Sequence, residues 1–254
     1  MHFSADKIRA LREEHAKLFG KCHKLIEAYV YRAYGCNKAK EYAIHGFSRR
    51  MKTIIRCVDN TFLALPPEAA TLPLTDDLAD AVINIQSFVF NIFGAIDNLA
   101  WIWVLEKGIL EKNGTPLRPR SVGLGKRNMV VRGSLSVGFQ EYLNELDPWF
   151  ENLENFRHAL AHRIPLYIPP YTVANGNMAA YEQIQGLMDE AITNLNFEEH
   201  DRLEREQKAL TSFAPVITHS FEEKSNPIYF HYQMLADFNT VEKIGNIMLE
   251  NINA

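Results

Sequence analysis

The feature that most constrains this fold is a long apolar segment near the middle of the chain. Between residues 81 and 105 its only charge is Asp97, and the segment has a helix start signal at Thr75 and a stop at Gly108. Its length alone is enough to span a membrane. However, six polar side chains are distributed through it, and each would need a partner within lipid: Asn84, Gln86, Ser87, Asn91, Asp97 and Asn98. We therefore predict a central bundle helix over roughly 76–108 and no membrane span.

Three asparagines in this segment recur every seven residues, at Asn84, Asn91 and Asn98. On a mostly buried helix, such a polar stripe either specifies the register against a packed neighbour or lines a site. Register is the usual role, and we expect it here.

The rest of the chain also reads mostly as helices separated by short breaks. Ser4 is placed to cap the first helix, and Pro66 follows the end of the second. Besides the central helix, we expect helices over roughly 4–33, 38–64, 134–145, 148–164 and 177–211, and a final short helix that opens at Thr240. This pattern is typical of a mainly α protein built as an antiparallel bundle of long helices.

The region near the C-terminus breaks the helical pattern. Residues 213–221 and 228–232 read as two short β segments around a polar turn, which predicts a small hairpin-like β element. No internal repeat or clear domain boundary divides the chain; the best candidate linker is 113–133, but we expect the apolar helices on both sides of it to pack together. We expect one domain over residues 1–254, with a bundle core at about 4–168 and a C-terminal extension at about 172–254.

The composition is that of an ordinary soluble globular protein, with 47% hydrophobic and 23% charged residues. A formal net charge of −4 argues against nucleic-acid binding through the overall field of the protein. The three cysteines follow no metal-ligand spacing and predict reduced thiols. Because the N-terminus lacks the apolar run of a signal peptide, we expect a cytoplasmic protein.

The charge is unevenly distributed along the chain. Residues 113–133, rich in glycine and proline, are expected to form a long loop. Residues 112–132 carry six basic residues and no acidic one, and these could bind phosphates: Lys112, Arg118, Arg120, Lys126, Arg127 and Arg132. Residues 182–206, in contrast, carry eight acidic side chains against two arginines.

The helix expected at 148–164 has clear boundaries and two different faces. Asp147 is placed to cap it, Pro148 suits its first position, and Pro165 ends it. One apolar stripe contains Trp149, Leu153, Phe156 and Leu160. His158 and His162 fall on the opposite, polar face.

This helix carries the string Arg157-His158-Ala159-Leu160-Ala161-His162, with Arg157 at the edge of the polar face. This string resembles the R-x(4–6)-H signature of the HEPN superfamily, and the resemblance covers roughly residues 76–168. A second match, Arg9-x5-His15, places its histidine near the apolar face of the first helix, where a core or boundary role is expected. The segment after Tyr171 is not explained by the resemblance.

The resemblance implies an all-α homodimer with metal-independent endoribonuclease activity at the subunit interface. His162 would exchange a proton with the ribose 2′-hydroxyl or the leaving oxygen, and Arg157 would stabilise charge on the scissile phosphate. His158 would orient substrate or act as a second acid or base, and no cofactor is expected. Supporting polar groups are expected at Asp97, Asn98 and Glu154. The partners implied are RNA, a second copy and a protein partner or antitoxin.

Two other interpretations remain open. The first is a non-catalytic interaction or scaffold module, in which Arg157, His158 and His162 form a polar interface patch salt-bridged to Glu154 or Asp97. The second is a metal site formed by Glu151, His158 and His162, which share one helix face. A further polar cluster of His219, His231 and Asp237 would form only if the two β segments pair.

Overall fold

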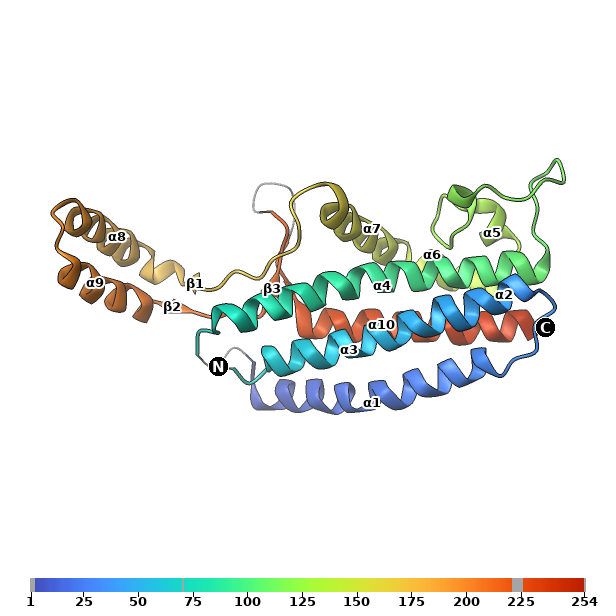
Figure 1. Ribbon diagram of the computed structural model, residues 1–254, viewed down its shortest axis with the longest axis horizontal. Helices are drawn as coiled ribbons and strands as arrows, with labels where there is room; N and C mark the ends of the chain where they lie inside the picture. Colours follow the sequence, from blue (N-terminus) through green and yellow to red (C-terminus); the bar gives the residue numbers. More distant parts are fainter. Residues whose placement is uncertain (1–2, 70, 221–225, 254) are drawn as a thin grey trace.

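Four long helices lie side by side along the long axis of the computed structural model, which describes residues 3–69, 71–220 and 226–253 (Figure 1). They are α1 (Ala5–Val30), α3 (Ser48–Ala64), α4 (Thr75–Lys107) and α10 (Phe230–Asn253). The predicted mainly α bundle is confirmed. Ser4 caps α1 by accepting a hydrogen bond from the Lys7 amide, and Gly108 ends α4 in the left-handed conformation, with φ +62°.

The hydrogen bonds between the helices fix their directions. Met51 on α3 accepts from Cys22 on α1, and Asn60 on α3 donates to Asn84 on α4, so these three helices alternate in direction. In contrast, Lys21 bonds Asn239, and Arg32, just beyond α1, bonds Asn253. Helix α10 therefore runs parallel to α1, and the bundle is antiparallel only over its first three long helices.

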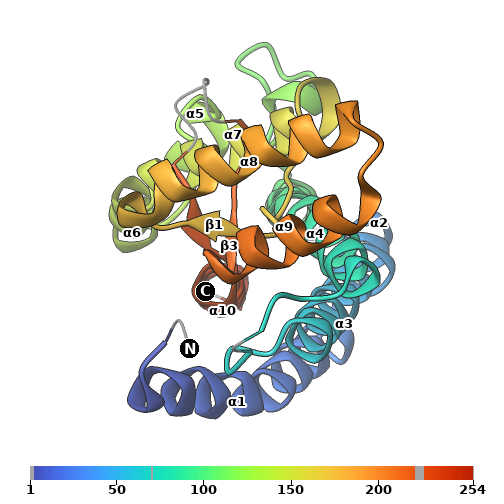
Figure 2. The same cartoon turned by 90° about the vertical axis from the view of Figure 1, so that its left-hand side faces the viewer.

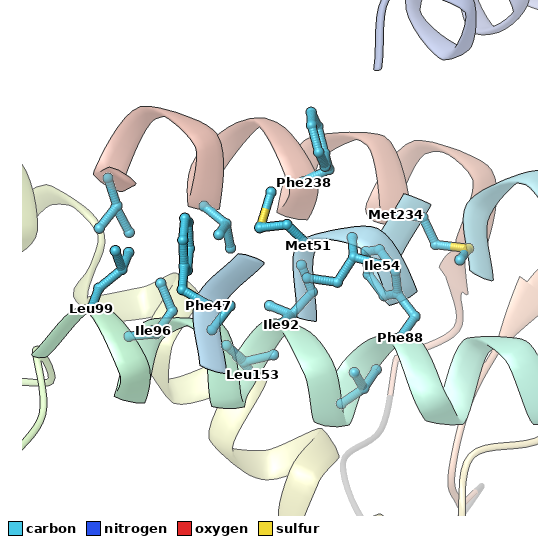
Figure 3. Packing of buried hydrophobic residues seen from close by; sticks show 14 of the residues in the cluster. Phe47, Met51, Ile54, Phe88, Ile92, Ile96, Leu99, Leu153, Met234 and Phe238 are labelled. Carbon is cyan, nitrogen blue, oxygen red and sulfur yellow. The ribbon is translucent and has the colours of Figure 1, made fainter. Parts of the chain in front are cut away.

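Apolar faces of these helices meet in one continuous core (Figure 3). The labelled side chains come from α3 and the turn before it, from α4, from α10 and from the helix that crosses α4, and they are at most 5% exposed: Phe47, Met51, Ile54, Phe88, Ile92, Ile96, Leu99, Leu153, Met234 and Phe238. The burial of α4 between its neighbours explains its apolar sequence without a membrane. Since α10 contributes throughout, the core extends beyond the expected 4–168.

The asparagine stripe of α4 meets polar groups of α3, as the register interpretation requires. Asn60 Nδ2 donates to Asn84 Oδ1 over 3.0 Å. The Arg50 guanidinium donates to the side-chain oxygens of Asn91, at 3.2 Å, and Asn98, at 3.1 Å. Gly94 makes room for this guanidinium, because a Cβ atom there would overlap it. A slip between the helices would break all three hydrogen bonds.

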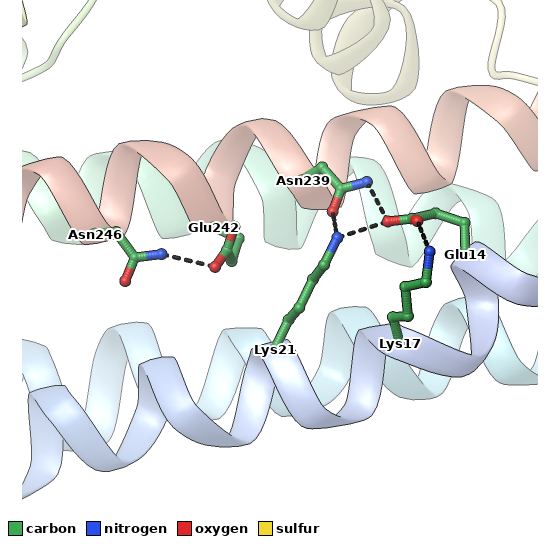
Figure 4. A network of polar contacts seen from close by, with 6 residues as sticks. All are labelled: Glu14, Lys17, Lys21, Asn239, Glu242 and Asn246. Carbon is green, nitrogen blue, oxygen red and sulfur yellow. Dashed lines mark hydrogen bonds and ion pairs between the residues drawn. The ribbon is translucent and has the colours of Figure 1, made fainter.

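A second polar network joins α1 to α10 (Figure 4). Glu14 accepts from Lys17, Lys21 and Asn239, and Lys21 also donates to Asn239 over 2.7 Å. The hydrogen bond from Lys21 is the main reason that the pKa of Glu14 is lowered to about 2, against the effect of burial. On the same side of α10, Asn246 donates to Glu242.

The predicted helix over 38–64 is interrupted by a wider turn. The structure has α2 (Asn37–Glu41), then a π-helical segment (Tyr42–Phe47), then α3. The Ser48 hydroxyl donates to the carbonyl of Ala43 over 2.8 Å, which satisfies one acceptor of this segment. Gly46 packs against the Asn98 side chain, so the wide turn lies directly over α4.

Between α4 and the motif helix, the chain is more structured than the expected loop. It contains a 3₁₀ turn (Pro119–Ser121) and α5 (Met129–Gly133), followed by α6 (Val137–Glu145). The motif helix is α7 (Asp147–His162), close to the predicted 148–164.

The prediction of one continuous acidic helix over 177–211 is wrong. A 3₁₀ turn (Asn175–Asn177) leads into α8 (Met178–Thr193), and α9 (Phe197–Ala209) folds back on α8. The chain reverses at Leu195, a residue other than glycine with a positive φ of 56°. Nothing in the local sequence marks this break with glycine or proline, the usual signals.

The predicted pair of β segments is present but shorter. Strands β3 (Val216–Ile217) and β4 (Ile228–Tyr229) pair antiparallel, while the turn expected around residues 221–225 lies outside the described residues. A second pair joins β1 (Thr172–Val173) to β2 (Thr211–Ser212). The prediction of a strand through residue 232 and a short helix from Thr240 is wrong. Helix α10 begins at Phe230 because its apolar side chains complete the bundle core.

Candidate functional site

Helix α7 lies across α4 and holds the predicted site residues (Figure 1). Leu153 and Phe156 of its apolar stripe are buried in the core, while Trp149 and Leu160 are half-buried against it. The polar face therefore points away from the bundle, as its sequence predicted. Asp147 is not the cap that the sequence indicated: it is the first helical residue, and its carboxylate pairs with Arg132.

Arg132 has a structural role that the sequence did not reveal. Its side chain is only 7% exposed, and its guanidinium donates to the carbonyls of Leu124, at 2.9 Å, and Leu143, at 2.8 Å. It also donates to Asn144 Oδ1 and, over 2.5 Å, to Asp147 Oδ1. Arg132 thus joins the segment before α5 to the start of α7, and its donors are not directed at a substrate phosphate.

An open cleft of about 620 Å³ lies between α4, the segment 119–128 and α7. Its apolar lining comes from all three parts: Phe93, Ile96, Val122, Leu124, Phe150 and Leu153. Nine ionisable side chains also line it: Asp97, Arg120, Lys126, Arg127, Asp147, Glu151, Glu154, Arg157 and His158. Seven of these were predicted as site residues, and Glu151 was named as a metal ligand, so the fold collects in one place residues far apart in sequence.

Arg157 is the cation at the centre of this lining. It is half-buried, and its guanidinium carbon lies 5.4 Å from the centroid of the Phe93 ring, in a cation–π contact. Within the described residues, no hydrogen bond or ion pair engages this guanidinium. Its planar donors are therefore available to an anion in the cleft.

Asp97 places an acidic group in the same cleft. Burial raises the pKa of its carboxyl to about 6, although the positive charges of Arg50, Arg157 and Arg127 act in the opposite direction. A group with this pKa can exchange a proton near neutral pH. Its position as the only charge in the apolar segment 81–105 was the sequence signal for it.

His158 lies at the exposed edge of the cleft. Its Nε2 atom is 3.6 Å from Glu154 Oε1, and Glu154 also accepts a hydrogen bond from Arg127. The His158 ring meets the His162 ring edge to face, with 6.2 Å between the centroids. These contacts form a small charged cluster at the rim.

His162 does not line the cleft in a single copy of the chain. It is the last residue of α7 and is exposed. Because it lies five positions after Arg157, the two side chains point about 140° apart around the helix axis. The two defining residues of the motif are therefore not brought together within one copy.

The other predicted residues lie elsewhere. Lys112 and Arg118 are exposed but are not among the residues that line the cleft. Asn98 is buried at the interface of α3 and α4, where it accepts from Arg50. Arg120 and Lys126 are exposed at the cleft rim, and no ion pair engages either of them in the described part of the chain.

The segment 122–128 owes its course to a residue pair that the sequence did not reveal. Gly123 is buried against the Asn128 side chain, and a Cβ atom there would lie 2.7 Å from Asn128 Oδ1. This close approach brings Lys126 and Arg127 over α7. Only a glycine fits at this position.

The proposed metal ligands do not form a site. Across residues 3–69, 71–220 and 226–253, no group of three or more histidine, cysteine, aspartate or glutamate side chains is arranged to hold a metal ion. This includes Glu151, His158 and His162. His231 Nε2 instead lies 2.7 Å from the carbonyl of Leu65, and Asp237 accepts from Trp149, so the alternative cluster with His219 is also not a metal site.

The second motif match has structural contacts. Arg9 pairs with Asp6 on the same helix. His15 Nε2 lies 2.8 Å from Asp59 Oδ1, and its ring stacks on Phe62 with 4.2 Å between centroids. His15 is thus the boundary histidine that its position predicted.

The chain matches no protein-family model, and comparisons with curated proteins and with solved structures found no similar protein. Among the described helices, α4 is the one that is long and apolar enough to cross a membrane, and 56% of its most apolar stretch is buried by the rest of the protein. The residues of the cleft are therefore the basis on which a function can be proposed.

Proposed function

We propose that the cleft binds the phosphodiester backbone of RNA and that the chain is a HEPN-like, metal-independent endoribonuclease. The observation that carries the proposal is the unpaired guanidinium of Arg157, which lines the cleft beside Asp97 and His158. Arg120 and Lys126 at the rim add positive charge for neighbouring phosphates. These cations gather in the cleft although the net charge of the chain is negative.

The reaction requires only groups that these residues supply. The ribose 2′-oxygen attacks the adjacent phosphorus as its proton passes to a base, and the bond from phosphorus to the 5′-oxygen breaks. A general acid protonates the leaving oxygen. Arg157 stabilises the negative charge on the non-bridging oxygens in the transition state. The products carry a 2′,3′-cyclic phosphate and a 5′-hydroxyl, and DNA is not a substrate.

Three groups can serve as the acid and the base. Asp97 and His158 line the cleft with Arg157, while His162 lies one turn beyond His158. A two-fold dimer in which the polar faces of two α7 helices meet would bring a His162 side chain of one copy to the cleft of the other. A homodimer is therefore part of the proposal, as is a cytoplasmic location, where RNA is available.

The chemistry can be tested with a single RNA oligonucleotide in the presence of excess chelator. We expect cleavage that is lost when the ribose at the cleaved position is 2′-deoxy. We also expect His158→Ala or His162→Ala to lower the rate by roughly 10²- to 10⁴-fold, the usual contribution of a general acid or base. Cleavage that continues at a 2′-deoxy position would exclude this mechanism.

The second candidate is a non-catalytic interaction module that binds a protein partner or antitoxin. One observation favours it: Glu154 is already paired with Arg127 and lies 3.6 Å from His158, so part of the charge at the rim is internally neutralised. RNA binding and cleavage both absent, with a stable complex recovered with a protein partner, would support this candidate.

A further inference from the structure

Helices α8 and α9 form an arm that projects from one end of the bundle (Figures 1 and 2). The arm has its own small core of Met188, Ala191 and Leu203, with Ile184 packed against it, separate from the main core. The short β1–β2 pair joins it to the body. The arm is thus a local unit that its own packing holds together.

The tip of the arm is apolar and exposed. Within six residues, Ile192 is 45% exposed, Leu195 is 74% exposed and Phe197 is 60% exposed. Three large apolar side chains at the end of a projecting hairpin leave a hydrophobic surface without cover in one copy of the chain.

Leu195 also occupies a position where its side chain is unfavourable for folding. The Leu195 amide bonds the Ile192 carbonyl, and the Asn196 amide bonds the Ala191 carbonyl, each over 2.9 Å. These two bonds define a helix end that normally has glycine at the left-handed position. Leucine at φ 56° has a steric cost that glycine would not have. Because the side chain is also exposed, it does not stabilise the fold of its own copy.

The tip lies in the most acidic part of the chain. Residues 182–206 carry eight acidic side chains against two arginines. Arg202 is paired internally with Glu199 and Glu206. Such a tip is complementary to an apolar cavity that has basic residues at its rim.

The cleft offers an apolar lining from Phe93, Val122 and Phe150, with Arg120 and Lys126 at its rim. Of its four carboxylates, two are neutralised by arginines, because Glu154 pairs with Arg127 and Asp147 with Arg132. Asp97 and Glu151 remain beside three cations that have no ion pair in the described residues, Arg120, Lys126 and Arg157.

The arm projects from the end of the bundle where α4 starts (Figure 1). The residues that line the cleft belong to the middle of α4, to α7 and to the segment before α5. The tip therefore cannot reach the cleft of its own copy without releasing the β1–β2 pair.

We infer that, in a resting dimer distinct from the dimer of facing α7 helices proposed above, the arm tip of one copy docks into the cleft of a second copy, and that a two-fold axis makes the exchange reciprocal. Such an interface is closed, since each copy supplies one tip and one cleft. The docking itself does not depend on the proposed function. Its consequence does: if the cleft binds RNA, the docked tip blocks RNA from the cleft and so regulates the site.

Crosslinking between two variants tests the docking directly, without RNA. Both chains carry Cys36→Ser, which leaves the buried Cys22 and Cys57. One chain also carries Leu195→Cys and the other Lys126→Cys. We expect a mixed disulfide between them on mild oxidation. Lys24→Cys, at an exposed position on α1, replaces Lys126→Cys in the control and should give none. An equal yield in both mixtures, or no crosslink in either, would overturn the inference.

Sedimentation of the full chain over a range of concentrations provides an independent measurement. Leu195→Gly suits the backbone at the tip, so the variant folds, yet it removes the docking side chain. We expect its dimer dissociation constant to rise roughly a hundredfold or more, since each dimer loses two buried leucines. Leu187→Ala, on the arm but away from the tip, should leave the constant unchanged. A monomeric wild-type chain, or equal constants for wild type and Leu195→Gly, would refute docking. Absence of ribonuclease activity would leave both measurements valid.

Discussion

Replacing Asp237 by asparagine should change how the stability of the protein depends on pH. The side chain is 4% exposed on α10, and its Oδ1 atom accepts hydrogen bonds from Trp149 and Gln233, each over 2.7 Å. Burial raises the pKa of this carboxyl from 3.8 to about 6, although both hydrogen bonds act to lower it. The folded protein therefore binds a proton more tightly than the unfolded chain does.

The sign and size of the effect follow from proton linkage. Between about pH 4 and pH 6 the folded state holds more protons at Asp237, so its contribution to stability decreases as pH rises through this window. The shift from 3.8 to about 6 corresponds to about 3 kcal/mol. The asparagine side chain would keep an oxygen acceptor for both donors and would not titrate. The free energy of unfolding of Asp237→Asn, relative to wild type, should therefore increase by about 2 kcal/mol from about pH 4 to pH 7, which is most of the full difference.

Urea denaturation at several pH values measures this difference directly. Asp201→Asn, at an exposed position on α9, controls for the loss of one negative charge. Any constant cost of the new amide group cancels when the two ends of the pH range are compared. The reasoning would be refuted if Asp237→Asn differed from wild type by the same free energy throughout the range.

Three further substitutions test the structural roles assigned above. Arg132→Met should destabilise the fold by about 3–5 kcal/mol in urea denaturation, since Asp147 and two carbonyls lose their donor; a loss below about 1 kcal/mol, typical of an exposed residue, would contradict its buried role. Gly94→Ala should cost about 1–3 kcal/mol because its methyl group displaces Arg50 from the asparagine stripe, and an unchanged melting temperature would argue against that packing. Leu195→Gly should stabilise a monomeric sample by about 1 kcal/mol, and destabilisation would show that the leucine contributes to the fold of its own copy.

The sequence predicted those elements whose signals are local. Helix α4 follows from its apolar length between Thr75 and Gly108, and α7 from its two prolines and its apolar stripe. The asparagine stripe predicted a register contact but could not name Arg50, which lies more than 40 residues from both of its partners on α4. Contacts at that separation are set by tertiary packing.

Elsewhere the local sequence pattern predicted the wrong structure or gave no signal. Residues 228–232 contain β-branched Ile228 and three aromatic residues, a composition that favours a strand, but burial of Phe230 and Met234 in the bundle core selects a helix. No glycine at Leu195 indicates the break between α8 and α9 in the sequence. The cleft itself depends on three distant segments, and Arg132 could not be distinguished from the exposed arginines because only the fold buries it.

The most direct test of the proposed function is the rate at which Arg157→Ala cleaves an RNA oligonucleotide in excess chelator under single-turnover conditions. Arg163→Ala is the matched control, since Arg163 is exposed just after α7 and lies outside the cleft. We predict that wild type and Arg163→Ala cleave at similar rates, and that Arg157→Ala is slower by roughly 10²- to 10³-fold, the usual loss for a group that stabilises transition-state charge. Equal rates for the two variants, or wild-type cleavage abolished by the chelator, would contradict the proposal.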